Sequence, residues 1–126
     1  MDIEKLFFYK TNAEIKSTKK YNGLSVNLSL LKMAKIKDML SLDFGYIVNY
    51  NPEIAVLSLD GKIILKGKKK EVDEVYSAWT KTQTLPKELA SRIANVVTTN
   101  CQITGVLVSK ALELPAPIIP PKISFK

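Results

Sequence analysis

The first half of the chain alternates apolar and polar side chains in the pattern of β-strands. Over residues 24–30, leucine or valine occupies every second position, with serine or asparagine between them. Because successive strand residues point to opposite faces of a sheet, this period of two predicts a strand with one buried face. Similar alternation runs over residues 7–15, 40–50 and 55–65, and in the first of these the odd-numbered positions form the apolar face. We therefore expect four strands within about residues 5–67.

Two points in this half leave the strand boundaries open. Residues 31–39 either continue the second strand or form irregular structure, because lysines interrupt the alternation. The dipeptide Asp60-Gly61 is typical of a two-residue hairpin turn. A hairpin there would bring lysine onto the apolar face, whereas an unbroken strand aligns Leu57 and Leu59 with Gly61. We favour one strand with a bulge or bend at Gly61, since the buried face sets the register.

The second half changes to the 3.6-residue period of amphipathic helices. Val72 and Val75 belong to an apolar stripe that predicts a first helix over about residues 71–82. A second helix is predicted over about residues 86–112, with a proline in its first turn, where no N–H is needed. Gly105 interrupts its stripe and allows either close packing or a small kink. Strands followed by two helices predict an α+β fold, with both helices on one face of a four-stranded antiparallel sheet.

Residues 113–126 predict an extended C-terminal arm, and residues 1–126 form one predicted domain. Prolines at four positions of the arm cannot continue a helix, and each pushes its preceding residue toward an extended conformation. The arm nevertheless carries five large apolar side chains, which are Leu114, Ile118, Ile119, Ile123 and Phe125. So much apolar surface needs a cover, either this chain's own core or a partner.

Apolar residues also fall on the sheet face that should be solvated. Phe7 and Phe8 are adjacent and therefore point to opposite faces, and Ile47 lies opposite the apolar face of its strand. The arm covers these residues, or a second copy does so by face-to-face packing of two sheets. We expect a homo-oligomer.

Aromatic residues are candidates for an apolar groove beneath the arm. Trp79 on the first helical stripe is typical of a core anchor, with a contact to a partner as the alternative. The tyrosines of the third strand are either groove residues or ordinary cross-strand pairs. The predicted peptide-binding residues are Phe7, Phe8, Tyr46, Tyr50, Trp79, Ile118 and Ile119.

Composition favours a binding protein over an enzyme. The chain has no histidine and one cysteine, so the commonest acid–base group and the usual zinc ligands are missing. We find no nucleophile motif and no phosphate-binding loop, and we expect no catalytic residue, metal or cofactor. No apolar run reaches the length of a membrane span and the chain does not begin with a leader-like segment. We therefore expect a cytoplasmic protein.

The net charge of +7 supports an alternative function. It comes almost wholly from lysine, which suits diffuse contact with phosphates better than base readout. If the lysines share one face, the chain is a structural subunit that binds RNA or the ribosome; otherwise they are solvated strand edges. The candidate nucleic-acid contacts are Lys16, Lys19, Lys20, Lys35, Lys37, Lys68, Lys69 and Lys70.

The order of elements and the C-terminal motif resemble the SecB-like family, which includes bacterial export chaperones and uncharacterised archaeal proteins. Residues 114–118 (Leu-Pro-Ala-Pro-Ile) and 123–125 (Ile-Ser-Phe) are similar to the terminus that follows that family's long helix. Residues 8–10 (Phe-Tyr-Lys) and Glu14 are similar to its first strand. The resemblance implies a homotetramer built by sheet stacking and an apolar groove that holds non-native polypeptide without ATP. The sequence therefore predicts a SecB-like protein that captures extended apolar polypeptide segments.

Overall fold

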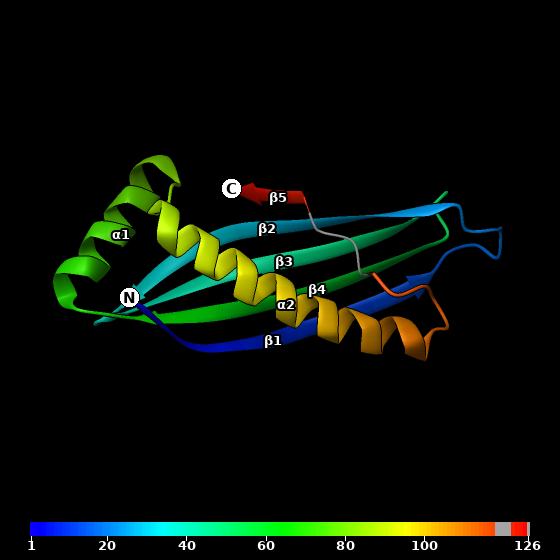
Figure 1. Cartoon of the computed structure of the whole chain (residues 1–126), viewed down its shortest axis with the longest axis horizontal. Helices are drawn as coiled ribbons and strands as arrows, with labels where there is room; N and C mark the ends of the chain where they lie inside the picture. The colour runs from blue at the N-terminus through cyan, green and yellow to red at the C-terminus, as the bar shows by residue number, and fades with distance from the viewer. Residues whose placement is uncertain (118–121, 126) are drawn as a thin grey trace.

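Residues 1–117 and 122–125 are described by the computed structural model of this protein. They form a strand-rich half followed by two helices and a short final strand (Figure 1). In chain order the elements are β1 (Asp2–Ile15), β2 (Gly23–Ile36), β3 (Met39–Asn51), β4 (Ala55–Lys66), α1 (Lys69–Thr82), α2 (Lys87–Ala111) and β5 (Lys122–Phe125). The predicted α+β fold is confirmed. The helices begin and end within two residues of the predicted ranges.

The strands form one sheet in the order β1-β4-β3-β2-β5. Strands β1 to β4 pair with one another in antiparallel fashion, and β5 joins the edge of β2 in parallel. The chain therefore crosses from one edge of the four-stranded part to the other between β1 and β2. The fifth strand is a difference from the predicted four, because the end of the C-terminal arm pairs with β2.

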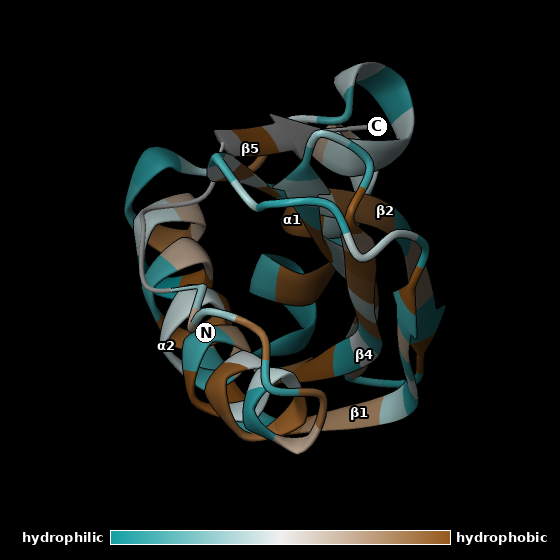
Figure 2. Ribbon diagram, turned by 90° about the vertical axis from the view of Figure 1, so that its right-hand side faces the viewer, coloured by the Kyte–Doolittle hydropathy of each residue, from teal (hydrophilic) through white to brown (hydrophobic). Residues whose placement is uncertain are grey.

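The core lies between the sheet and α2. Alternate residues of β3 and β4, such as Leu42 and Leu59, are fully buried, and the buried stripe of α2 includes Ile93 and Val97. Figure 2 shows the sheet curving around this core, with α2 on the open side of the curve. The buried residues of the strands and the buried stripe of α2 thus form one apolar layer between sheet and helix. Among the described residues, neither helix is long and apolar enough to span a bilayer.

The strand through Gly61 is continuous, as the buried face predicts. Gly61 lies in the middle of β4, opposite Phe8 of β1 and Phe44 of β3. A Cβ atom built on Gly61 would lie 2.5 Å from Cζ of Phe44 and 2.5 Å from the carbonyl oxygen of Phe7. The rings of Phe8 and Phe44 meet edge to face, with centroids 5.7 Å apart. Glycine at this position therefore permits close packing within the sheet and does not form a turn.

The predicted facing of β1 is wrong over part of residues 7–15. The register of β1 against β4 shifts between Phe8 and Lys10, which adds one residue to β1 at that point. Phe8 consequently packs on the core, as Ala13 does. Phe7 and Tyr9 lie on the opposite sheet face, where they line a shallow pocket. A bulge changes the phase of the alternation, and the odd-numbered face predicted from the sequence ignores it.

The uncertain segment 31–39 resolves into strand and turn. β2 continues to Ile36, with a register shift between Leu30 and Met33. Lys37 adopts a left-handed conformation with φ of 57° before β3 begins at Met39. The lysines that interrupt the alternation therefore mark a bulge and the end of the strand.

Candidate functional site

The first part of the C-terminal arm packs against two tyrosines of β3. After α2 ends, Glu113 adopts a left-handed conformation and the chain turns back over the sheet. The Tyr50 hydroxyl donates a hydrogen bond to the carbonyl oxygen of Pro115 at 2.6 Å, and the Tyr46 hydroxyl donates one to that of Pro117 at 3.5 Å. The two tyrosines are four residues apart on one strand, so both point to the helix side of the sheet. They hold the arm through its backbone.

Gly105 of α2 completes this contact. A Cβ atom built on Gly105 would lie 3.1 Å from Cγ of Pro117 and 3.7 Å from Cε1 of Tyr46. Pro117 is buried, whereas Pro115 is exposed. The bare helix backbone therefore accommodates the Pro117 ring, and the glycine permits close packing. We name Tyr46, Tyr50 and Gly105 the arm-binding surface.

The position of α2 explains why the arm is needed here. α2 packs over β4 and β1, and α1 packs over β2 and β3. On the β3 and β2 side of the sheet, Pro115 and Pro117 contact Tyr50 and Tyr46, and β5 lies on the edge of β2 (Figure 1). The described parts of the arm thus lie against β3 and β2, beside the strands that α2 covers.

Burial raises the pKa of the two tyrosines of the arm-binding surface. Tyr46 and Tyr50 both have 0% exposure of their surface. Burial raises the pKa of Tyr46 to about 12 and that of Tyr50 to about 12, because the charged form loses its hydration. A tyrosine hydroxyl is protonated at neutral pH even at its ordinary pKa, and burial extends that range to more alkaline pH. Both hydroxyls are therefore donors that suit the carbonyl groups of a polypeptide.

The end of the arm forms β5 on the edge of β2. Lys122 to Phe125 pair in parallel with Asn27 to Leu30. β2 has 14 residues and β5 has 4, so the contact covers a short part of the edge. Ile118 and Ile119, which the sequence assigns to peptide binding, lie outside the described residues.

The other predicted peptide-binding residues do not gather at the arm. Phe8 packs in the core against Phe44. Trp79 is 5% exposed and belongs to the core beneath α1. Phe7 lies on the opposite sheet face. Of the five predicted residues that the structure describes, Tyr46 and Tyr50 are the two that it brings together with the arm.

Gly105 was not assigned a binding role from the sequence, although a signal was present. A glycine inside a helix lowers its stability relative to alanine, so its presence suggests a close approach by another segment. What approaches it depends on how the arm folds back. The sequence leaves close packing and a kink open, and the structure shows close packing with Pro117.

Apolar side chains are exposed on both layers of the molecule. On the outer sheet face, Ile47 is exposed, and polar residues flank it on the neighbouring strands, Asn27 of β2 and Ser58 of β4. On α2, Ile103 and Leu107 expose 59% and 66% of their surface. Residues 93–109 of α2 contain no charged side chain. The helix therefore presents the less polar of the two surfaces.

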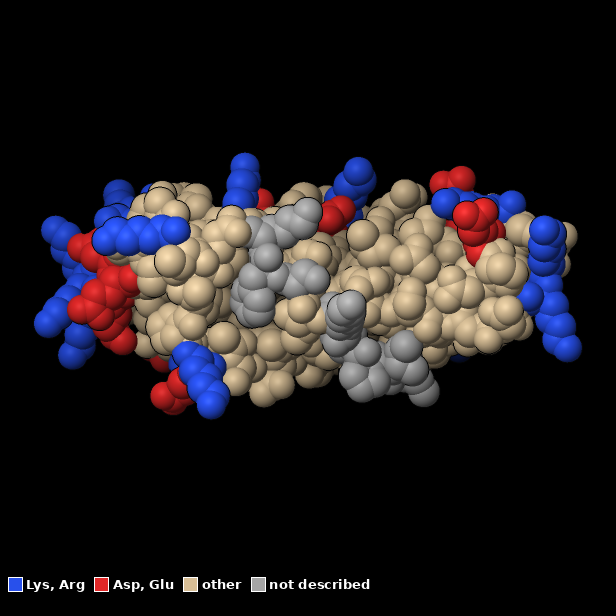
Figure 3. All heavy atoms as spheres, turned by 90° about the horizontal axis from the view of Figure 1, so that it is seen from above, with Lys and Arg blue, Asp and Glu red and all other residues tan. Residues whose placement is uncertain are grey.

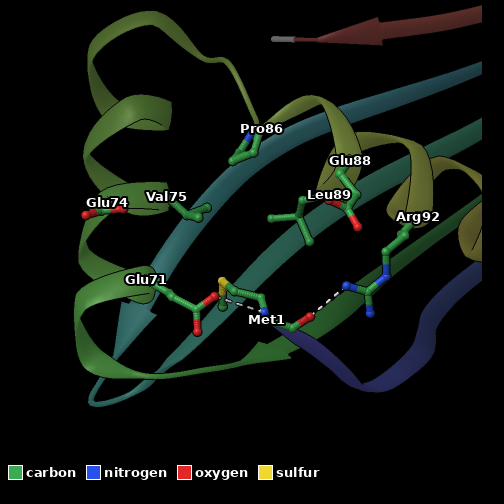
Figure 4. A pocket seen from close by; sticks show the side chains of 8 residues that line it. All are labelled: Met1, Glu71, Glu74, Val75, Pro86, Glu88, Leu89 and Arg92. Atoms are coloured by element: carbon green, nitrogen blue, oxygen red, sulfur yellow. Dashed lines mark hydrogen bonds and ion pairs between the residues drawn. The ribbon is translucent and has the colours of Figure 1, made fainter.

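The charged residues near the N-terminus hold the ends of the helices together. A cavity of about 300 Å³ lies between α1, α2 and the start of β1 (Figure 4). The amino group of Met1 lies 3.3 Å from Oε2 of Glu71, and Nη1 of Arg92 donates a hydrogen bond of 2.8 Å to the carbonyl oxygen of Met1. Both contacts stabilise the position of the N-terminal strand. Across the described ranges, no cluster of His, Cys, Asp or Glu could hold a metal ion.

The predicted lysine contacts divide between the two ends of the sheet. Lys16, Lys19 and Lys20 follow the end of β1, beside the start of β4. The remaining five lie at the opposite end, around the β2–β3 turn and the start of α1, and are Lys35, Lys37, Lys68, Lys69 and Lys70. Figure 3 shows basic side chains gathered at both ends of the molecule. They do not form one basic face, and the RNA-binding alternative stays a prediction without structural support.

Comparisons with known proteins identify the fold. No family model matches the chain, and no curated protein matches it. A solved structure of a SecB-like chaperone from Mycobacterium tuberculosis, in complex with a ChAD peptide from the HigA1 antitoxin, is similar with a TM-score of 0.60. The match covers 94% of this chain and 84% of that chain, at 11% sequence identity. Four antiparallel strands followed by two helices agree with this neighbour. The protein therefore has the fold of the SecB-like chaperones.

Proposed function

We propose that this protein is a non-enzymatic, SecB-like binding protein that captures extended apolar polypeptide segments. The observation that carries the proposal is the seating of the arm. An extended, proline-containing segment lies between Tyr46, Tyr50 and Gly105 and is held by its carbonyl groups. The similar chaperone from Mycobacterium tuberculosis was solved with a bound peptide, which supports polypeptide as the class of ligand.

The chemistry of the contact suits a broad range of polypeptides. A backbone carbonyl is present in every residue, so a tyrosine hydroxyl that donates to it does not select a side chain. Apolar packing against the buried rings adds affinity, and this contribution does not depend on the direction of the contact. Neither contact requires a nucleotide or a reactive group. A protein of this kind would bind exposed, extended polypeptide segments with little regard to their side-chain sequence.

The first expected result is suppression of aggregation. The chain, added in several-fold molar excess to citrate synthase unfolding by heat, should lower the light scattering of the client without ATP. Capture of extended apolar segments removes them from intermolecular association. Serum albumin at the same mass concentration is the control for non-specific effects. Scattering that matches the albumin control at every ratio would contradict the proposed function.

We also propose a homo-oligomer, in which α2 contributes the contact. Ile103 and Leu107 are one turn apart and well exposed, and the chain around them is uncharged over residues 93–109. Because each copy carries a net charge of +7, contact between two copies brings the fewest like charges together where uncharged surfaces meet. A two-fold contact between two such helices satisfies this condition.

The second expected result concerns this helix face. The double substitution I103K/L107K should convert the oligomer to a monomer in sedimentation equilibrium, since it sets four ammonium groups against one another across a two-fold contact. The circular dichroism of the variant should stay unchanged, because both positions are exposed. The matched control S77K/T80K adds the same charge to exposed positions of α1. A wild-type chain that sediments as a monomer at micromolar concentration would rule out the oligomer.

A further inference from the structure

The arm-binding surface is occupied in this structure by the chain's own tail. Residues 114–117 lie on it, and β5 extends the same segment along the edge of β2. We infer that the tail is an internal occupant of the client site, and that a client must displace it. This inference rests on the proposed function and names the site, its regulation and its class of ligand.

The chemistry of the tail defines the class of ligand. Residues 114–121 carry no charge and contain four prolines, which offer carbonyl acceptors but no N–H donors. Tyr46 and Tyr50 supply donors to two of these carbonyls, and their hydroxyls remain protonated at neutral pH. The surface therefore matches an uncharged, apolar, extended segment whose backbone lacks donors at the tyrosines. Proline-containing segments of unfolded chains fit this description.

The tail has few described contacts that a client must replace. They are the hydrogen bonds from Tyr50, at 2.6 Å, and from Tyr46, at 3.5 Å, the burial of Pro117, and the pairing of β5 with four residues of β2. Within the described part of the chain, no strand pairs with the rest of that edge of β2. A longer client strand could pair with more of the edge than β5 does, in the manner of strand addition to a sheet.

Attachment of the tail to α2 sets the strength of competition. A tethered segment acts at an effective concentration on the order of millimolar. A free segment at micromolar concentration must compete with the tail. The apparent affinity of the free segment is its intrinsic affinity multiplied by the fraction of molecules in which the surface is vacant. Weakening the tail should therefore strengthen client binding.

Two substitutions release the tail but have opposite effects on a client. P117D brings a carboxylate to a buried position and drives the tail off while leaving the surface intact. G105L fills the space of the Pro117 ring, so it excludes both the tail and any segment that binds as the tail does. Release of the tail should appear in both variants as faster trypsin cleavage after Lys122, because an undocked strand is accessible to protease.

The probe is a fluorescein-labelled peptide with the sequence of residues 112–126, added to the full chain and followed by fluorescence anisotropy. We expect P117D to bind it about tenfold more tightly than the wild type does. G105L should bind it at least about tenfold more weakly than P117D does. The matched controls are A116D, which puts the same charge at the exposed neighbouring position of the arm, and S91L, which adds leucine at an exposed position of α2. Both should behave as the wild type.

The outcomes separate this inference from the proposed function. Equal peptide affinity in wild type, P117D and G105L, with tail cleavage accelerated in both variants, would overturn the inference. The same holds if no form of the chain binds the peptide, and light scattering with citrate synthase then decides the proposed function independently. If G105L fails to fold, comparison of P117D with A116D still decides, because equal affinity in these two contradicts displacement of the tail.

Discussion

Replacing Gly61 with alanine is expected to destabilise the fold by about 3 kcal/mol or more, the largest effect of any single methyl group that we anticipate. The added Cβ would meet both Cζ of Phe44 and the carbonyl oxygen of Phe7 at 2.5 Å, and the second contact is with backbone. β1 and β3 flank this position, so neither neighbour can move without disturbing strand pairing. The midpoint of thermal unfolding, measured by circular dichroism, should fall by roughly 10 °C.

Gly23 provides the matched control for this substitution. It also lies in a strand, but a Cβ there meets no atom within 4 Å. G23A should therefore leave the midpoint unchanged or raise it slightly, because alanine reduces the entropy of the unfolded chain. A G61A variant as stable as G23A would contradict the close packing of β1, β3 and β4 around Gly61.

Substitution of Trp79 with alanine should lower the free energy of unfolding by about 3 to 5 kcal/mol, because it leaves a cavity beneath α1. Trp79 is 5% exposed and packs with the buried residues of the core, so its ring contributes to stability. Urea denaturation followed by far-ultraviolet circular dichroism would measure the loss. The result also tests whether Trp79 is a core anchor or a contact to a partner.

The control W79F separates these two roles. Phenylalanine retains most of the apolar volume, so W79F should lose much less stability than W79A and should bind the labelled peptide as the wild type does. A folded W79F with wild-type stability but without peptide binding would instead make Trp79 part of the binding surface. That result would restore the role that the sequence suggested.

The sequence predicted the local elements well because each depends on its own period. Val72 and Val75 in α1 repeat at helical spacing, and Leu57 and Leu59 in β4 repeat at strand spacing. The choice of one strand through Gly61 also followed from the buried face alone. These patterns hold wherever the element packs, so they can be read from the chain itself.

The candidate site was predicted in part for the same reason. Tyr46 and Tyr50 lie on the apolar face of a strand that the alternation predicts, and the prolines of the tail predict an extended segment. Phe7 and Phe8 were grouped with them because no pattern shows which sheet face lies beneath the arm. The extra residue near Tyr9 adds to the error, because a bulge reverses the facing of everything on one side of it.

Apolar periods in the sequence by themselves determined the α+β class, the helices and most of the strands, because local backbone geometry fixes which residues share a face. The tertiary structure decided three further features: the pairing of β1 with β4, the return of the tail to β2, and the meeting of Pro117 with Gly105. Each of these joins residues that are distant along the chain. Such contacts depend on which surfaces remain open once the core has packed, and no local repeat records that information.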